Sequence, residues 1–368
     1  MRLFILTVLL SFSFNVIGQA PLKQVDHLLD SIFVKDQPGI AVAIVKDGKT
    51  IFSKGYGIAN TITKTKLTAA TNFNIASLTK QFTAAGILYL QEKGMLDINQ
   101  HISQYFPDMN KKVAEKVTLK QLLTHSSGII NHYDFVKVEK GKHGYAKHVY
   151  DAIKDKDSLY FTPGSSLRYS NTAYCLAGLI IEKISGKTYN TFMKQTFFSP
   201  LKMNNSTVWN EKEKIFEAAT GYDKDNATGQ FIKSQAEEHV FFSTEGDGAI
   251  YTSVDDYVKW FKGLQMASIL NKKDIALTRS IQNKIPRHNG MGYGYGWFVN
   301  NRQQPAYIYH SGGNGGFRTY SFSIPGLDYL VVIFANRSDI NIENIVIQIN
   351  QILFPKLPAL IPIEQLTS

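Results

Sequence analysis

The apolar residues at both ends of the chain gather into short runs that are rich in β-branched and aromatic side chains. Residues 39–45 and 50–52 form two such runs around Asp47-Gly48, so we expect a hairpin there. Further runs follow one another at hairpin spacing near the C-terminus: 293–299, 306–309, 317–324 and 329–335. Both ends of the chain therefore predict strands.

The middle of the chain, from about residue 95 to 285, has the apolar spacing of helices joined by long loops. One helix is expected from Ser77 to Lys93, where Gly94 supplies a stop signal. A strongly apolar helix is expected over 173–184, ended by Ser185-Gly186, and a terminal helix is expected over 340–353. Two more helical segments are predicted: 118–123 and one that opens at a capping box in 252–256.

These segments predict an α+β fold, because strands from the two ends of the chain enclose a helical insertion. We expect an antiparallel sheet formed from N- and C-terminal strands and flanked by helices, with an inserted all-α subdomain. The expected parts are a signal peptide at 1–18 and one domain at 19–368, with a sheet lobe at about 21–80 and 286–356 and a helical lobe at about 81–285. A cleft between two lobes is a natural place for a site.

The first eighteen residues have the composition of an export signal. Met1-Arg2 supplies a positive start, residues 3–17 are apolar, and Gly18-Gln19-Ala20 offers small residues for cleavage. Cleavage after Gly18 is favoured, because Pro21 would directly follow a cut after Ala20. A membrane anchor is the alternative, but fifteen apolar residues are short for a span. We therefore expect an exported protein, periplasmic or secreted, without a stable membrane span.

Composition narrows the classes of function. Of 368 residues, 44% are hydrophobic and 19% are charged, as in ordinary globular proteins. The 40 basic and 30 acidic residues give a formal charge of +10, but the basic residues are spread along the chain without a nucleic-acid-binding motif. We expect no nucleic-acid partner; the charge indicates a solvated surface or an affinity for anionic cell-wall polymers or membrane surfaces. Cys175, the only cysteine, excludes an internal disulfide and is expected to be a small buried residue.

Ser77-Leu78-Thr79-Lys80 places a hydroxyl and an amine three residues apart, on one face of the predicted helix. At the helix start, Ser77 would lie near unpaired backbone N–H groups, which favour an oxyanion. A desolvated Lys80 would lose its proton more easily and help to activate Ser77. The alternative is an ordinary N-cap serine and a surface lysine. Ser199 and Lys202 repeat the spacing, but a turn follows them.

Tyr169-Ser170-Asn171 follows a turn-forming loop and precedes the apolar helix. A phenol acts as a general base only beside positive charge, which Lys80 could supply. Asn171 offers an amide that could hold Lys80 or a substrate carbonyl. Taken alone, this motif is more typical of an ordinary helix cap.

His310-Ser311-Gly312-Gly313 follows an apolar run, and its glycines would let the backbone approach a ligand closely. The N–H of Gly313 could join that of Ser77 as an oxyanion hole. A core histidine is the alternative explanation for His310.

With these motifs in this order, the chain resembles the serine β-lactamase and penicillin-binding-protein superfamily, specifically its class C β-lactamase-like group of serine hydrolases and D,D-peptidases. The resemblance spans roughly residues 25–355 and rests on four segments: Ile75 to Phe82, Leu122 to Gly128, Pro163 to Asn171 and His310 to Gly313. It implies a nucleophile and its lysine in the first motif, a base in the tyrosine motif, and a substrate-binding strand with an oxyanion donor in the last. By motif match, the catalytic residues become Ser77, Lys80 and Tyr169, and the substrate or oxyanion residues Asn171, His310, Gly312 and Gly313.

Two departures weigh against a dedicated β-lactamase. Such enzymes of this group usually have lysine where His310 stands, and histidine is commoner in relatives that act as peptidases or esterases. A glutamine that often contacts the substrate amide has no clear match near residues 131–133. His125 and Asp247 lie in loops that resemble the family's cleft loops, without an implied catalytic role.

The leading hypothesis is an exported serine hydrolase that forms an acyl-enzyme at Ser77. Its substrates would be D-amino-acid peptides of peptidoglycan type or small amides and esters, as for a D,D-carboxypeptidase or an esterase. The alternatives are a β-lactamase that hydrolyses β-lactam antibiotics and a non-hydrolytic module that binds a cell-wall ligand. This chemistry requires no cofactor, and the sequence contains no His-Glu-x-x-His metal motif. The expected partner is a small-molecule or peptide substrate; the oligomeric state stays open.

Overall fold

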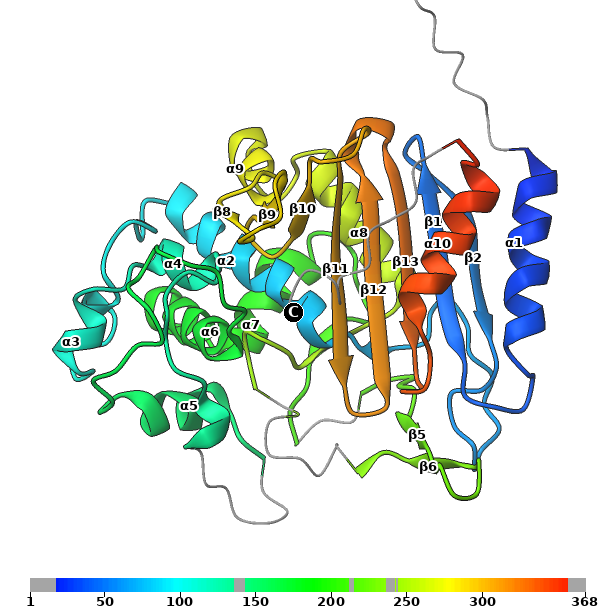
Figure 1. Ribbon diagram of the computed structural model, residues 1–368. Helices are drawn as coiled ribbons and strands as arrows, with labels where there is room; N and C mark the ends of the chain where they lie inside the picture. The colour runs from blue at the N-terminus through cyan, green and yellow to red at the C-terminus, as the bar shows by residue number, and fades with distance from the viewer. Residues whose placement is uncertain (1–17, 136–142, 212–214, 236–241, 243, 357–368) are drawn as a thin grey trace, which may run out of the picture.

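The structure is a computed structural model that describes residues 18–135, 143–211, 215–235, 242 and 244–356 (Figure 1). The predicted signal peptide, apart from Gly18, lies outside the described residues. Within those ranges, no helix combines the length and the apolar character that crossing a bilayer requires.

The predicted α+β fold is confirmed. Among the described residues, strands from the two ends of the chain form one antiparallel sheet of eight strands. At its centre, β1 (Ile40–Lys46) pairs with β13 (Tyr329–Ala335), and every residue of both strands is buried. The order is β2-β1-β13-β12-β11-β10-β9-β8, which adds β2 (Lys49–Tyr56), β8 (Asn283–Lys284), β9 (Met291–Tyr293), β10 (Phe298–Asn300), β11 (Tyr307–Asn314) and β12 (Phe317–Ile324).

The strand boundaries differ from the expected ones in two places. The N-terminal hairpin is confirmed, and its turn residues Asp47 and Gly48 have φ of 50° and 72°, as a type I′ turn requires. The stretch 293–299 forms the end of β9, a turn and the start of β10 rather than one strand. β11 continues beyond the expected 306–309 as far as Asn314, because its pairing with β12 continues to the opposition of Asn314 and Phe317.

Helices cover both faces of the sheet. α1 (Gln19–Ile32) and α10 (Ile342–Leu353) pack together on one face, against β2 and β12 respectively (Figure 1). The other face is covered by α8 (Val254–Gln265), which contacts β1, β2 and β13. The predicted start of α8 is confirmed, because the Ser253 side chain accepts the N–H of Asp256.

The helical part of the chain is organised around α6 (Asn171–Ser185), which packs along α2 (Thr79–Glu92). α6 also contacts α4 (Leu119–Leu123), α5 (Ala146–Ile153) and α7 (Tyr189–Met193). Gly186 ends α6 with a φ of 66°, as the sequence predicts. The remaining short elements include β3 (Phe73–Asn74), β4 (Thr207–Val208), β5 (Tyr222–Lys224), β6 (Phe231–Lys233), β7 (Ile250–Thr252), α3 (Lys111–Ala114), α9 (Lys272–Thr278), η1 (Ala76–Leu78), η2 (Ile102–Gln104), η3 (His132–Asp134), η4 (Lys194–Phe198) and η6 (Pro325–Leu327).

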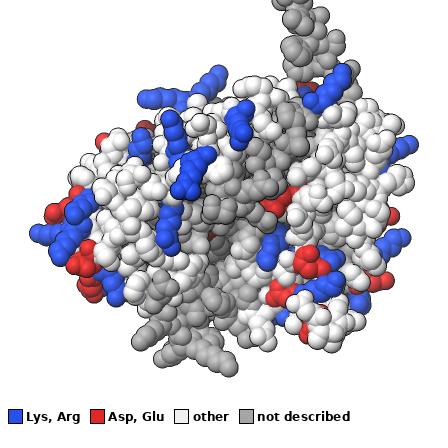
Figure 2. All heavy atoms as spheres, in the orientation of Figure 1, with Lys and Arg blue, Asp and Glu red and all other residues white. Residues whose placement is uncertain are grey.

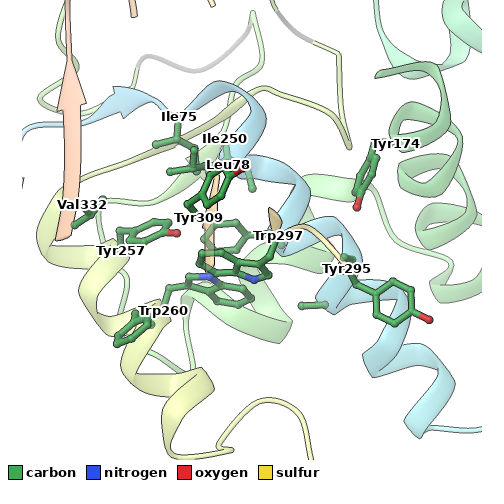
Figure 3. Packing of buried hydrophobic residues seen from close by; sticks show 14 of the residues in the cluster. Ile75, Leu78, Tyr174, Ile250, Tyr257, Trp260, Tyr295, Trp297, Tyr309 and Val332 are labelled. Carbon is green, nitrogen blue, oxygen red and sulfur yellow. The ribbon is translucent and has the colours of Figure 1, made fainter. Parts of the chain in front are cut away.

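The two parts of the fold meet at η1, which contacts β11 and β12 and leads directly into α2. Ile75 and Leu78, on either side of Ser77, point into the core beside Ile250 (Figure 3). Ser77 itself stays partly exposed at this junction. On the face in Figure 2, Lys and Arg side chains are spread over both halves of the molecule among Asp and Glu.

Candidate active site

Ser77 lies in the 3₁₀ turn η1, before α2 begins, and not in the first turn of the α-helix. Ala76 has a φ of 48°, a left-handed conformation that alanine rarely adopts. Asn74 Oδ1 accepts the Ala76 N–H at 2.8 Å, and the Thr319 hydroxyl donates to the Ile75 carbonyl at 2.9 Å. Surrounding strands therefore hold the nucleophile turn in a strained conformation. Leu78 occupies the N-cap of α2, so the N-cap explanation for Ser77 is wrong.

Lys80 is fully buried directly beneath Ser77, so the surface-lysine alternative is wrong. Its Nζ donates to Ser77 Oγ at 3.0 Å and to the main-chain carbonyl of Asp247 at 2.9 Å. The same Nζ lies 4.9 Å from the ring centre of Tyr169 and 5.6 Å from that of Tyr174. Two oxygens and two aromatic faces therefore hold this amine against the serine.

Tyr169 approaches Lys80 from the loop before α6, as the motif predicts. Its ring is partly buried and stacks on Phe298 with an interplanar angle of 10° at 6.4 Å. His125 lies against it at 4.3 Å, and His310 lies 6.1 Å away. The structure thus brings Tyr169 together with Lys80 and His310, although they are far apart in the sequence.

His125 supports Tyr169 through the backbone as well as through its ring. It is fully buried, and its Nδ1 accepts the N–H of Ser170 at 3.0 Å, which places the ring proton on Nε2. His125 has a φ of 54°, and its carbonyl accepts the N–H of Arg168 at 2.9 Å. Burial, and then the charge of Lys80, hold its pKa well below the usual value, so the imidazole is neutral.

His310 is 1% exposed, and both of its ring nitrogens have partners. Nδ1 donates to the Ser311 carbonyl at 2.7 Å, and the Tyr293 hydroxyl donates to Nε2 at 3.0 Å. Burial and the charge of Lys80 lower its pKa to about 3. The His310 side chain is therefore neutral and buried, as the core-histidine interpretation predicts. Its backbone belongs to β11, the strand that contacts η1.

Asn171 begins α6 and its side chain does not contact Lys80. Its Nδ2 donates to the Tyr133 hydroxyl at 2.8 Å, and its Oδ1 is buried with no partner among the described residues. Tyr133 comes from η3 and remains 43% exposed. The amide of Asn171 is thus held by Tyr133, a residue to which the sequence motifs assign no role.

The two glycines that follow Ser311 have different surroundings. A Cβ on Gly312 would lie 2.4 Å from Thr319 Oγ1 and 2.7 Å from the Ile75 carbonyl oxygen, so η1 packs directly on this backbone. A Cβ on Gly313 would meet only the Arg318 side chain, at 3.5 Å or more. β10 pairs with β11 only through residues 307–309, so the edge of β11 from His310 to Asn314 faces η1 instead of a strand.

Asp247 contacts Lys80 through its main-chain carbonyl and Cys175 through its carboxylate. Asp247 is 8% exposed, and its carboxylate accepts hydrogen bonds from the Thr244 hydroxyl at 2.6 Å and the Cys175 thiol at 3.3 Å. Burial raises the pKa of Cys175, and the nearby Asp247 charge raises it further, so this residue stays a protonated thiol. The prediction that Cys175 is a small buried residue is confirmed.

The second Ser-x-x-Lys motif itself forms a backbone turn, whereas the sequence predicts a turn only after it. The Lys202 N–H donates to the Ser199 carbonyl at 3.0 Å, and Lys202 has a φ of 56°. Three contributors to the first site have no motif of their own: Tyr133, Tyr293 and the Asp247 carbonyl. The glycine-flanked segment Gly246-Asp247-Gly248 indicates a turn, and this turn places the Asp247 carbonyl against Lys80.

Comparison with known proteins agrees with this arrangement. The family model described as Beta-lactamase matches residues 26–344. "Protein flp" of Staphylococcus aureus (strain N315) is 28% identical over 89% of this chain, and "Penicillin-binding protein 4*" of Bacillus subtilis (strain 168) is 29% identical over 81%. The chain spans 66% and 68% of these two relatives, so about two thirds of their length.

Among solved structures, the octameric penicillin-binding protein homologue from Pyrococcus abyssi superposes with a TM-score of 0.80. It is 28% identical, and the match covers 92% of this chain and 78% of that one. The similarity therefore extends over both the sheet and the helical part.

Proposed function

Because this chain belongs to the β-lactamase family of serine hydrolases, we propose that Ser77 forms an acyl-enzyme on D-amino-acid peptides of peptidoglycan type or on small amides and esters. The observation that carries the proposal is the 3.0 Å contact between Lys80 Nζ and Ser77 Oγ, with Lys80 sealed from solvent. A lysine that serves only as a surface charge has no reason to be buried against a hydroxyl.

In the proposed reaction, Ser77 Oγ attacks the substrate carbonyl carbon while its proton passes to the Lys80 and Tyr169 pair. The carbon–leaving-group bond then breaks, and the same proton moves to the departing amine or alkoxide. Water attacks the resulting ester, returns a proton to Ser77 Oγ and releases the acid. Lys80 and Tyr169 are suited to this transfer because the Nζ lies against both the serine hydroxyl and the phenol ring.

The strand β11 is the proposed binding edge for substrate. An extended peptide can add to the 310–314 edge through main-chain hydrogen bonds, which would place its carbonyl between Ser77 and this strand. The N–H groups of Ser77 and Gly313 would then hold the developing oxyanion, and the amide of Asn171 a carbonyl on the acyl side.

Two observations support a peptidase or esterase over a dedicated β-lactamase. His310 is neutral, so this strand position carries no fixed cation of the kind that lysine supplies in the class C enzymes. Two of the relatives and neighbours carry penicillin-binding protein in their names, which supports cell-wall peptides as the substrate class. We further propose export to the periplasm or the exterior, since residues 1–18 have the composition of a signal peptide.

The test is the intact mass of the protein during incubation with benzylpenicillin, beside a Ser77→Ala variant. We expect a single adduct of one penicillin on the wild-type chain and none on the variant. A long-lived adduct supports a D,D-peptidase-like enzyme, and rapid loss of the adduct with consumption of the drug supports the β-lactamase alternative. An adduct on Ser77→Ala would contradict the assigned nucleophile.

If neither adduct nor drug loss occurs, β-lactam recognition is excluded, and hydrolysis of p-nitrophenyl esters and D-amino-acid amides tests the remaining substrate class. Equal binding of cell-wall peptides by the wild-type chain and Ser77→Ala, without product, would support the non-hydrolytic module instead.

We expect His125 to act as a positioning residue for Tyr169. In His125→Asn, the side-chain Oδ1 can still accept the Ser170 N–H, and asparagine tolerates the positive φ, but the ring that supports Tyr169 is lost. His125→Ala loses both supports and leaves the Ser170 N–H without its acceptor. We expect kcat for a small ester to fall about tenfold in the first variant and about 100-fold in the second.

The measurement is kcat and KM with the folded fraction determined for each variant by its thermal transition. A positioning role lowers kcat with little change in KM. Equal kcat in both variants and the wild type, after correction for the folded fraction, would contradict it.

A further inference from the structure

A cavity of about 710 Å³ lies beside Thr71 and Tyr251, next to the short strand β3 that precedes Ser77, and outside the catalytic cluster. Its walls come from the loop between β2 and β3, from the segments after β4 and before β5, and from Tyr251 of β7. Small-molecule sites in proteins have volumes of roughly 300 to 1,000 Å³, so the cavity is large enough for a ligand of one or two rings.

The lining combines neutral hydrogen-bonding groups with one indole. Thr65, Thr68 and Asn60 line the cavity together with Trp209 and His143. Among the lining residues that the structure describes, the carboxylates of Glu211 and Glu217 outnumber the ammonium of Lys66, although the chain as a whole carries a formal charge of +10. This lining disfavours an anionic ligand and suits a neutral one with hydroxyl and amide groups around an apolar face, which is the chemistry of N-acetylated amino sugars.

Trp209 is held in place while part of it remains exposed. The main-chain N–H of Trp209 donates to the Ala249 carbonyl at 2.7 Å, and its ring packs against His143 at 4.5 Å and meets Phe242 edge-on at 6.5 Å. Trp260 and Trp297, the other tryptophans of the chain, are each 1% exposed. A fixed, partly exposed indole in a cavity wall offers a surface on which a sugar ring can stack.

The cavity lies within reach of the proposed acylation site. Tyr251 pairs with Asn74, which precedes Ser77 by three residues, so its Cα lies at most about 16 Å from that of Ser77. At the far end of the β11 edge, Asn314 Nδ2 donates to the carbonyl of Phe242, the residue that packs on Trp209. A peptide that leaves Ser77 along this edge is therefore directed toward the cavity.

We propose that this cavity binds an amino-sugar unit of a glycan whose attached peptide is the substrate at Ser77. The proposal rests on the proposed function, because peptidoglycan joins its peptides to such a glycan. An extended peptide of four residues spans about 14 Å, which lies within the limit of about 16 Å between the Cα atoms of Ser77 and Tyr251. The cavity would thus select peptides that are still attached to their glycan.

The first experiment is a tryptophan-fluorescence titration with the N-acetylglucosamine tetramer, which requires no hydrolysis. Because Trp260 and Trp297 are sealed, a saturable change in emission reports on Trp209. Thr65→Arg should abolish the change by filling the cavity, whereas Ile62→Arg, in the same loop but outside the lining and 88% exposed, should keep it. No saturable change in the wild type, or an unaltered change in Thr65→Arg, would overturn the proposal.

The second experiment compares hydrolysis of a disaccharide pentapeptide with that of the free pentapeptide. The quantity compared is the KM for the disaccharide pentapeptide divided by the KM for the free pentapeptide. We expect Thr65→Arg to raise this ratio about tenfold and Ile62→Arg to leave it unchanged. An unchanged ratio in Thr65→Arg would contradict the proposal that one substrate binds both the cavity and the site at Ser77. If the proposed function fails, neither peptide is cleaved by any variant, while the fluorescence titration still decides whether the cavity binds the sugar.

Discussion

Lys80→Met should slow acylation of Ser77 by about 10³-fold or more without unfolding the protein. Methionine has a similar length and suits the apolar rings of Tyr169 and Tyr174, but it cannot accept or donate a proton. The Asp247 carbonyl loses one hydrogen bond, which costs about 1 kcal/mol and lowers the thermal midpoint by a few degrees. The rate of adduct formation with benzylpenicillin, or of ester hydrolysis, measures the effect.

Lys183→Met is the matched control for Lys80→Met. Lys183 Nζ also donates to a main-chain carbonyl, that of Tyr105 at 2.7 Å, and lies 4.7 Å from the ring centre of Phe106. Its position toward the C-terminal end of α6 is about 18 Å along the helix from Asn171. We expect the wild-type rate in this variant. A comparable loss in both variants, or a wild-type rate in Lys80→Met, would exclude Lys80 from the proton transfer.

Gly312→Ala should lower kcat/KM by about 100-fold, whereas Gly313→Ala should change it by less than about threefold. The new methyl group at position 312 would overlap Thr319 Oγ1 and the Ile75 carbonyl oxygen, so η1 must move away from β11. Such overpacking costs about 1 to 3 kcal/mol of stability, and it displaces the turn that carries Ser77. At position 313 a methyl group meets only the Arg318 side chain, and the N–H remains available.

The two glycine variants are compared by kcat/KM for a small ester and by thermal unfolding. Near-equal activities would show that the spacing between η1 and β11 does not set the rate. Loss of activity in Gly313→Ala alone would show that this glycine is required by the substrate rather than by the packing, because nothing in its surroundings forbids a Cβ.

The candidate site could be predicted from the sequence to the extent that its contacts are local. The serine and the lysine are three residues apart, Ser77 in η1 and Lys80 in the first turn of α2, so their contact follows from the spacing of continuous helical turns. Tyr169 and the glycine strand could be assigned only through the family resemblance. The catalytic roles remain predictions, since the geometry brings Ser77, Lys80 and Tyr169 together without testing what they do.

Other features of the site depend on residues that are distant in the sequence. Asn171 was a candidate partner of Lys80, but it contacts Tyr133, because η3 packs over the start of α6. His310 was a candidate substrate residue, and its side chain is occupied by Tyr293 and its own strand. The partners of both side chains are set by the elements that bury them, and these elements are distant in the sequence.

Three features with short-range signals could be predicted from the sequence alone: the Asp47-Gly48 hairpin, the apolar helix α6 with its Gly186 end, and the contact of Ser77 with Lys80. Three other features depend on contacts between distant segments: the left-handed conformation of Ala76, the burial of Lys80 against the Asp247 carbonyl, and the length of β11. The physical reason is that backbone propensity and side-chain periodicity act over a few residues, whereas strain and desolvation are imposed by partners that only folding brings into contact.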